Sequence, residues 1–331
     1  MLWYNRDMST EETVEREAEK FRLTYAFAQK DPEGFRSLTG LSVEEFEELR
    51  HEIEQEYEEA EEERLDRPDR QRQRGAGGPF RLPLCDRLLL TLTWLRVYLS
   101  YAALGLLFGL HKSNVCRNLQ RMLPLVQRRT EEALPAEGSE EGKEDLETIL
   151  ERYPELRAIL DATEQRVERP GEEATQKAHY SGKKKAHTLK TQVVVNAQGR
   201  IQHVSGSVPG SKHDVTLARE SEVTGQVPPG VALEGDKGYQ GLEGKEGQQE
   251  VQTPHKKPRG GELTEEQKLF NRVFNRGRVI VEHALAQLKV FQVLKQVYRH
   301  RRAQHNTIFR IIAGLVNRRL DRRLAAAAAA A

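Results

Sequence analysis

The sequence has few of the residues on which several classes of protein depend. Its 331 residues include only two cysteines, Cys85 and Cys116, and no Cys-x-x-Cys pair. This scarcity leaves no support for a disulfide framework or a zinc cluster, and it favours a reducing compartment. The N-terminus also lacks the pattern of a cleavable secretory signal, so we expect a cytoplasmic protein.

Long apolar runs are equally scarce, and the one candidate covers residues 88–110. Its length is that of a membrane-spanning helix, but Arg96 lies near its middle, where a charge costs about 2.5 to 3.5 kcal/mol on insertion. Basic residues flank both ends, so the run carries no orientation signal. We therefore expect two buried helices, Leu88–Leu95 and Tyr101–Phe108, and no membrane partner.

Charge is plentiful but unevenly distributed. The formal net charge is only +1, yet residues 44–63 hold twelve glutamates, and residues 299–323 hold eight arginines with one acid. Such segregation of sign indicates a nucleic acid or another charged partner. At this length we expect more than one domain.

The N-terminal helical region, residues 1–66, contains a helix that starts at Ser42. Ser42 and Glu45 have the spacing of a capping box. The glutamate face of this helix is either solvated or binds a partner, and it cannot lie on DNA. Its apolar stripe is too narrow for a core of its own, so we expect the same chain or a second copy to cover it, and we predict a contribution to a homodimer contact. The stripe consists of Phe46, Leu49, Ile53 and Tyr57.

Residues 67–81 form a basic linker in this prediction, and residues 82–130 a helix-turn-helix domain. Gly109 supplies the turn, and Ser113 caps a third helix that runs to about Arg128. The polar face of that helix is either merely solvated or reads DNA, because its residue types reach phosphates and base edges. The residues expected on this exposed face are Lys112, Asn114, Arg117, Asn118 and Arg121.

A second linker, residues 131–145, is expected before a mixed α/β domain at residues 146–324. Three antiparallel strands, a helix, a fourth strand and terminal helices form the order of an RNase H-like core. The poly-alanine tail, residues 325–331, contributes nothing to this prediction. The expected strands and first helix are Leu156–Val167, Thr188–Asn196, Arg200–Ser207, Asp214–Glu220 (helix) and Val231–Gly235.

Three carboxylates are expected where these elements meet. Asp236 follows the fourth strand, Asp161 follows the apolar run Leu156–Leu160, and Glu282 lies on a helical stretch. Carboxylates from three separate elements suggest a site for Mg²⁺, which prefers oxygen ligands. For Asp236 the simpler alternative is a turn cap, and for Glu282 it is an i,i+4 pair with Arg278.

Several motifs resemble those of DDE-superfamily insertion-sequence transposases, with the Harbinger-like catalytic domains nearest. These motifs are Leu160–Glu164, Gly210–Asp214, Gly235–Tyr239 and the helix around Glu282, and residues 101–115 resemble the helix-turn-helix that precedes that core. Arg278, Glu282 and Lys289 match a family signature whose tyrosine position is Asn275 here.

The resemblance implies a transposase that binds terminal inverted repeats and target DNA, acts as a homodimer in the bacterial nucleoid, and cleaves and transfers DNA strands. Asp161, Asp236 and Glu282 would hold two Mg²⁺ ions, for which Mn²⁺ can substitute. The alternatives are a DNA-binding regulator without catalytic activity and a nuclease without strand transfer. Further DNA contacts are expected at Lys256, Lys257, Arg278 and Lys289, and His213 and Asp214 are auxiliary candidates, Asp214 being either an N-cap or a rival second acid.

Overall fold

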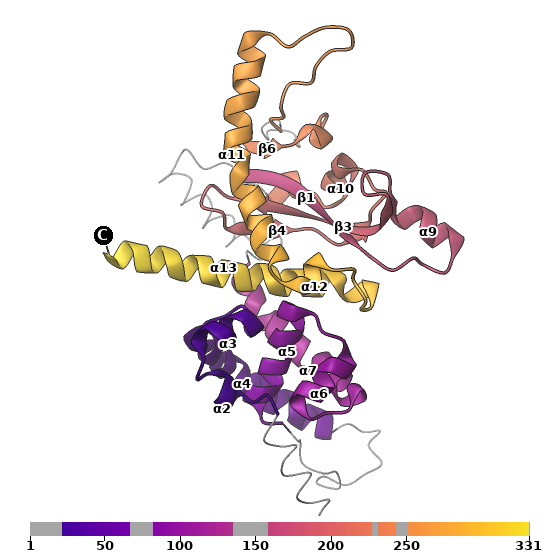
Figure 1. Ribbon diagram of the computed structural model, residues 1–331. Helices are drawn as coiled ribbons and strands as arrows, with labels where there is room; N and C mark the ends of the chain where they lie inside the picture. The colour runs from indigo at the N-terminus through magenta and orange to yellow at the C-terminus, as the bar shows by residue number, and fades with distance from the viewer. Residues whose placement is uncertain (1–21, 67–81, 135–157, 227–230, 243–250, 331) are drawn as a thin grey trace, which may run out of the picture. The chain divides into compact units, whose positions relative to one another are not determined.

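A computed structural model describes residues 22–66, 82–134, 158–226, 231–242 and 251–330 (Figure 1). The chain forms two compact units, Met1–Arg129 and Thr130–Ala331, the first helical and the second built on a sheet. The predicted linker 67–81 and most of the predicted linker 131–145 lie outside the described residues, as does much of the predicted N-terminal helical region.

The longest helix of the first unit, α4, begins with the cap that its sequence predicts. The Ser42 hydroxyl accepts from the Glu45 N–H (3.2 Å), and the Glu45 carboxylate accepts from the Ser42 N–H (2.6 Å), so the predicted capping box is confirmed. Pro32 and Gly40 mark the start and the left-handed end of another helix. The helices are α2 (Tyr25–Ala28), α3 (Pro32–Thr39), α4 (Val43–Leu65), α5 (Leu84–Val97), α6 (Tyr101–Phe108) and α7 (Lys112–Glu131).

The apolar stripe of α4 is covered inside the same unit. Phe46, Leu49 and Ile53 are fully buried, and the ring of Phe46 stacks on Tyr25 with centroids 4.9 Å apart and meets the edge of Phe35. Of the two predicted covers, the same chain is therefore the one observed, and the contribution of the N-terminal region to a homodimer stays a prediction.

The glutamate face of α4 is not only solvated. Glu56 forms an ion pair with Arg129, and Glu61 lies 3.8 Å from Arg121. Both arginines belong to α7, so part of the acidic face neutralises cations of its own unit.

The apolar run at residues 88–110 forms two core helices, as predicted. α5 is buried on all sides from Asp86 to Leu95, and it ends at Tyr98 in a left-handed conformation (φ 59°). Gly109 closes α6 at φ 64°, the turn required between α6 and α7. Within the described ranges no helix is long and apolar enough to cross a membrane.

The start of α7 differs from the prediction. The helix begins at Lys112 rather than after a Ser113 cap. The Ser113 hydroxyl lies inside the first turn, 2.8 Å from Nδ1 of His111. His111, one residue before the helix, therefore takes the place that Ser113 was expected to fill.

The second unit is built on a six-stranded sheet in which β1 lies between β3 and β6. β1 runs antiparallel to β3 and parallel to β6, and β3 also pairs antiparallel with β4. Pro209 belongs to β5, which pairs with β3. The strands are β1 (Ala158–Arg166), β2 (Tyr180–Ser181), β3 (Ala186–Val195), β4 (Ile201–Val204), β5 (Val208–Pro209) and β6 (Leu233–Gly235).

Helices cover both faces of this sheet (Figure 1). Leu160 of β1 packs in a core with Ala218 of α10 and with Tyr239. Gln165, which points to the opposite face, donates to the carbonyl of Val293. The helices are α9 (Glu173–His179), α10 (Asp214–Glu220), η1 (Val223–Gln226), η2 (Lys237–Tyr239), α11 (Glu265–Lys289), α12 (Gln292–Lys295), η3 (Arg302–Gln304) and α13 (His305–Ala330).

Asn317 joins α13 to the edge of the sheet. Its side chain is fully buried. Its Oδ1 accepts from the N–H of Ile201 (2.9 Å), and its Nδ2 donates to the carbonyls of Ile201 (2.8 Å) and Ala133 (2.9 Å). One amide therefore satisfies both backbone groups of a β4 residue and holds the segment that precedes the sheet.

His305 is buried at the start of α13 in a fixed hydrogen-bond chain. Because Gln165 donates its amide to two carbonyls, its Oε1 accepts from Nε2 of His305 (2.8 Å). Nδ1 of His305 then accepts from the Ser207 hydroxyl (2.7 Å). Both ring nitrogens are used by the neutral form, and burial lowers the pKa of His305 to about 4.

We expect this histidine to make the second unit less stable in acid. The unfolded chain binds the proton near pH 6.5 and the folded chain near pH 4. Its stabilising contribution, on the order of 3 kcal/mol, is therefore complete above pH 6.5 and is lost as the pH falls towards 4. Urea unfolding of the wild type and of His305→Asn at several pH values measures this, and equal pH dependence in the two proteins would contradict it.

Candidate active site

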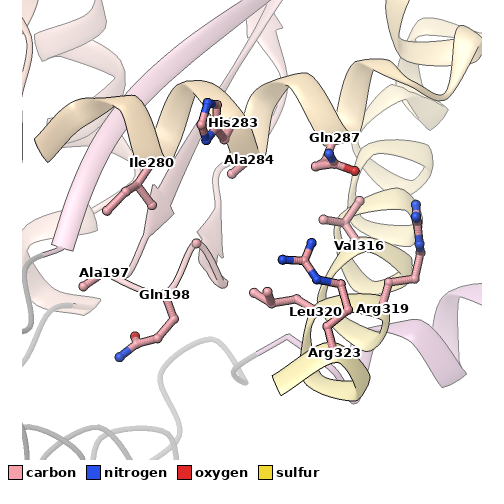
Figure 2. Close-up of a pocket in the computed structure, with 11 residues that line it drawn as sticks. Ala197, Gln198, Ile280, His283, Ala284, Gln287, Val316, Arg319, Leu320 and Arg323 are labelled. Atoms are coloured by element: carbon pink, nitrogen blue, oxygen red, sulfur yellow. The ribbon is translucent and has the colours of Figure 1, made fainter. Parts of the chain in front are cut away.

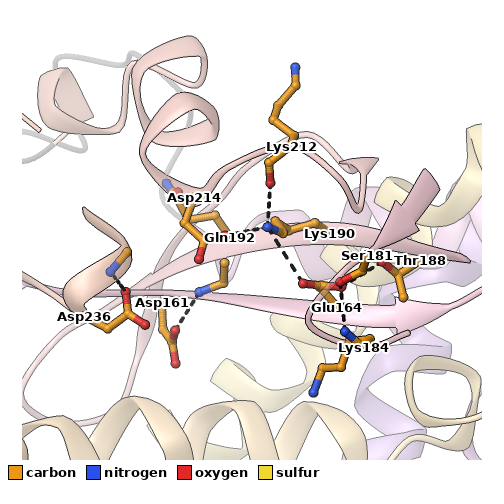
Figure 3. A network of polar contacts seen from close by, with 12 residues as sticks. Asp161, Glu164, Ser181, Lys184, Thr188, Lys190, Gln192, Lys212, Asp214 and Asp236 are labelled. Atoms are coloured by element: carbon orange, nitrogen blue, oxygen red, sulfur yellow. Dashed lines mark hydrogen bonds and ion pairs between the residues drawn. The ribbon is translucent and has the colours of Figure 1, made fainter. Parts of the chain in front are cut away.

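The register of two neighbouring strands brings Asp161 and Asp236 together. β1 and β6 are parallel, and Leu160 is paired with Gly235, so each acid is the residue that follows a paired position. Paired strands lie about 4.8 Å apart, and Figure 3 shows the two carboxylates side by side. The prediction that these acids meet through strand pairing is confirmed.

Asp161 lies in a partly desolvated position that favours added positive charge. Burial raises the pKa of its carboxyl, Arg278 and the Ala162 N–H oppose that rise, and the nearby Asp236 adds to it. Nη2 of Arg278 lies 3.6 Å from Oδ2 of Asp161. A half-buried carboxylate beside a second one fits a divalent cation, because the cation would offset both the burial and the repulsion.

Asp236 is held at the start of η2. Its Oδ1 accepts from the Gly238 N–H at 2.8 Å, which is the turn cap foreseen as the simpler reading. Its second carboxylate oxygen has no such bond among the described residues. Capping one oxygen fixes the side chain and leaves the other for a ligand.

Glu282 lies on α11 four residues after Arg278, and within the described residues it is not grouped with the two aspartates. Its spacing places it on one face of α11 with Arg278 and Lys289. Arg278 forms its ion pair with Asp161, so the predicted alternative of a pair with Glu282 is wrong. Glu282 itself is exposed, and in the described part of the chain no three His, Cys, Asp or Glu side chains are positioned to hold a metal.

Lys289 lies at the other end of the same face. Burial lowers the pKa of its ammonium, Lys184 lowers it further, and Asp161 opposes the shift. α11 therefore places one cation on each side of Glu282, and both cations act on Asp161.

The sequence suggested that Asp214 caps α10, but the structure does not show this cap. The N-cap is His213, which is exposed and makes no capping bond with its side chain. Oδ1 of Asp214 instead accepts from Nζ of Lys190 at 2.7 Å. Lys190 also donates to the carbonyl of Lys212 (2.6 Å) and lies 3.8 Å from Glu164.

Lys190, Asp214 and Glu164 form a partly buried network (Figure 3), and Gly238 lies close to both Asp214 and Asp236. A Cβ atom on Gly238 would lie 2.9 Å from Oδ1 of Asp236 and 3.0 Å from Oδ2 of Asp214. A side chain at this position would therefore require the two carboxylates to shift. Lys190 and Glu164 were not predicted as site residues, although a lysine in the middle of a strand that continues into Val193–Val195 was a usable signal.

The predicted DNA-reading face of α7 is only partly present. Lys112, Asn114 and Arg117 are exposed, and Arg121 is half-exposed beside Glu61. The prediction that Asn118 is exposed is wrong. Its Oδ1 accepts from Nε of Arg87 (2.9 Å) and its Nδ2 donates to the Arg87 carbonyl (3.1 Å), so the amide holds α5 and α7 together.

Lys256 and Lys257 lie on an exposed loop that is attached to α11. The loop is fixed by His255, whose N–H donates to Oδ1 of Asn271 (2.8 Å) and whose carbonyl accepts from Nδ2 of the same residue (3.1 Å). The segment forms a loop and not a strand, apart from a single bridge between Glu234 and Gln252. Both lysines are exposed, and Nζ of Lys257 lies 4.0 Å from the exposed carboxylate of Glu262.

A cavity of about 460 Å³ lies between α11, α13 and the turn after β3 (Figure 2). Ile280 and Val316 contribute apolar surface to it, and Arg319 and Arg323 contribute charge. By helical spacing, Ile280 points away from the side of α11 that carries Arg278 and Glu282. The cavity is therefore separate from the acids.

Comparison with known proteins gives two family matches and one close relative. Residues 160–317 match the family described as DDE superfamily endonuclease, and residues 80–132 match the helix-turn-helix of DDE superfamily endonuclease. The chain is 33% identical over 249 residues to a probable transposase for insertion sequence element IS702 from Microchaete diplosiphon, an alignment that covers 75% of this chain and 85% of that protein. No solved structure matches.

Proposed function

The chain belongs to the DDE superfamily of insertion-sequence transposases, with a helix-turn-helix ahead of the endonuclease domain, and we propose that it binds the terminal inverted repeats of its element and catalyses metal-dependent strand cleavage and strand transfer. The observation that carries the proposal is that Asp161 and Asp236 each directly follow the last paired position, Leu160 opposite Gly235, of the parallel strands β1 and β6. The strand order β4-β3-β1-β6 supports assignment of the sheet to the RNase H-like class.

In this proposal Asp161, Asp236 and Glu282 hold two Mg²⁺ ions, for which Mn²⁺ can substitute. When bound, such a pair activates water or a 3′-hydroxyl and stabilises the leaving oxygen. Asp161 lies beside Asp236 through the pairing of β1 with β6, and Asp236 is oriented by the Gly238 N–H. Glu282 would supply the third carboxylate, and a bound cation would compete with Arg278 for the carboxylate of Asp161.

In this proposal the lysine and arginine side chains on α11 and on the neighbouring loop bind the DNA backbone. Lys289 and Arg278 flank Glu282 on α11, while Lys256 and Lys257 extend from the loop beside it. Coordinated cutting of two element ends requires two active sites, so we propose a homodimer that acts on DNA in the nucleoid. His213, exposed at the start of α10, remains an auxiliary candidate.

Incubating the full chain with labelled element ends, target plasmid and Mg²⁺ tests the proposal. Cleaved and joined products are expected together. A second candidate function, a DNA-binding regulator without catalytic activity, predicts specific binding and no products. Cleavage without joining would indicate a nuclease that lacks strand transfer.

We expect Arg117 to read DNA bases, since it is exposed on the helix that follows the turn. Arg117→Ala should reduce discrimination between the element end and unrelated DNA by about 1 to 3 kcal/mol. Lys256→Ala should weaken binding to both DNAs alike and reduce the salt dependence of the affinity by roughly one unit of slope. Binding isotherms at several salt concentrations measure both, and equal losses on both DNAs for Arg117→Ala would exclude a reading role.

A further inference from the structure

The first half of α11 carries apolar side chains that nothing in the described chain covers. Leu269 is 58% exposed and Val273 is 54% exposed. The second half is different, because Val281, Leu285 and Leu288 are buried against the sheet domain. Figure 1 shows the first half extending beyond the sheet. Clustered exposed apolar residues on one rigid helix indicate a binding surface.

These residues belong to a stripe with a self-complementary order of charge. Glu266, Leu269, Val273 and Arg276 recur at i, i+3, i+7 and i+10, which places them on one side of the helix. The order is acid, apolar, apolar, base, and it is symmetric about the level of Asn271. An antiparallel copy of the same helix would set Leu269 against Val273 and Glu266 against Arg276.

The charges at the two ends of the stripe are available for this pairing. Within the described residues neither Glu266 nor Arg276 forms an ion pair, whereas the neighbouring Glu265 is paired with Lys268 at 2.8 Å. A parallel arrangement would instead bring Glu266 against its own copy, and the same would hold for Arg276. Like charges in contact are unfavourable, so only the antiparallel arrangement satisfies both ends.

The helix is also braced on the side away from the stripe. Asn271 lies about half a turn from the stripe and exchanges two hydrogen bonds with the backbone of His255. Phe270 stacks on Phe274 with centroids 5.6 Å apart. The loop that steadies α11 therefore leaves the stripe open.

We infer that a second copy of this chain binds the stripe, with the two α11 helices antiparallel across a two-fold axis at the level of Asn271. The association is argued from the stripe alone, and only its purpose, joining two active sites, rests on the proposed function. Glu282 lies eleven residues from the axis, so the two copies of Glu282 are separated by about 33 Å along the paired helices.

A charge exchange tests this arrangement in the full chain. We expect a dimer for the wild type by analytical ultracentrifugation, and Glu266→Arg or Arg276→Glu alone should raise the dimer Kd at least about tenfold. The double variant Glu266→Arg/Arg276→Glu should restore the dimer, since the pair is re-formed with its signs exchanged. Lys268→Glu is the matched control, because it changes the charge of α11 outside the stripe.

A monomeric wild type, with and without element-end DNA, would overturn the inference, and so would a double variant no better associated than the single ones. Circular dichroism establishes that each variant is folded. Cleavage of a single labelled end, measured in parallel, separates the two conclusions. If a monomeric wild type cleaves DNA, the proposed catalytic activity holds and the inferred dimer does not. If the wild type is a dimer that does not cleave DNA, the dimer holds and the proposed catalytic activity does not.

Discussion

Replacing Asp161, Asp236 or Glu282 by alanine is expected to reduce DNA cleavage by at least about a thousandfold, equivalent to about 4 kcal/mol of activation free energy. Each substitution removes a carboxylate oxygen from the site that would hold the cations. DNA binding should remain nearly unchanged, because the exposed residues of α7 and the basic loops are untouched. Cleavage of labelled element ends and a binding isotherm on the same preparations provide the two measurements.

Asparagine variants separate charge from packing. Asp236→Asn can still accept the Gly238 N–H through its amide oxygen, so the η2 turn is retained. A loss as large as that of the alanine variant would assign the effect to the missing charge. Asp214→Asn is the comparison for the rival acid. If Asp236→Ala cleaves at the normal rate while Asp214→Asn does not, Asp214 is the second catalytic acid.

The second large effect is expected at Lys190, whose side chain is 8% exposed between Asp214 and Glu164. Lys190→Met leaves two poorly solvated carboxylates without their cation. Removing one partner of a buried ion pair costs about 3 to 5 kcal/mol. The triple variant in which Asp214→Asn and Glu164→Gln accompany Lys190→Met should recover most of this loss, because no buried charge then lacks a partner.

The measurement uses the distribution of tryptophan. Trp3 and Trp94 both belong to Met1–Arg129, so tryptophan fluorescence follows the first unit only, while circular dichroism follows both. During urea unfolding, the fluorescence transition of Lys190→Met should match the wild type, and the remaining circular dichroism change should move to lower urea. Unchanged transitions by both probes would show that Lys190 is not required for stability.

The meeting of Asp161 and Asp236 could be predicted because each acid directly follows a short apolar run, and pairing of two such runs in parallel brings the residues after them together. β1 continues to Arg166, so Asp161 lies within its strand and only Asp236 follows the end of one. The face of α11 was equally predictable from the spacing of Arg278 and Glu282. What the pattern could not supply was the distance between Glu282 and the aspartates, which depends on how α11 packs on the sheet.

Polar residues in the interior were the main source of error. Asn118 and Lys190 were assigned to the surface or overlooked, since hydrophobic periodicity treats polar side chains as exposed. Asn118 lies beside the core positions Val115, Leu119 and Met122 of α7. It is buried because its side chain forms hydrogen bonds with Arg87 in place of water. Asp214 was assigned to a cap for a similar reason, because its partner Lys190 lies 24 positions away in the chain.

The bonds of Asn317 to Ile201 and Ala133 imply an order of events during synthesis. Asp161 and Asp236 leave the ribosome first, but β4 lacks this support until α13 has been made, about eighty residues after Asp236. At 5 to 20 residues per second this interval is roughly 4 to 16 s. Because α11 and α13 are both late, a nascent chain that already carries the helix-turn-helix can meet DNA before it has a complete nuclease, and a truncated product would bind without cutting.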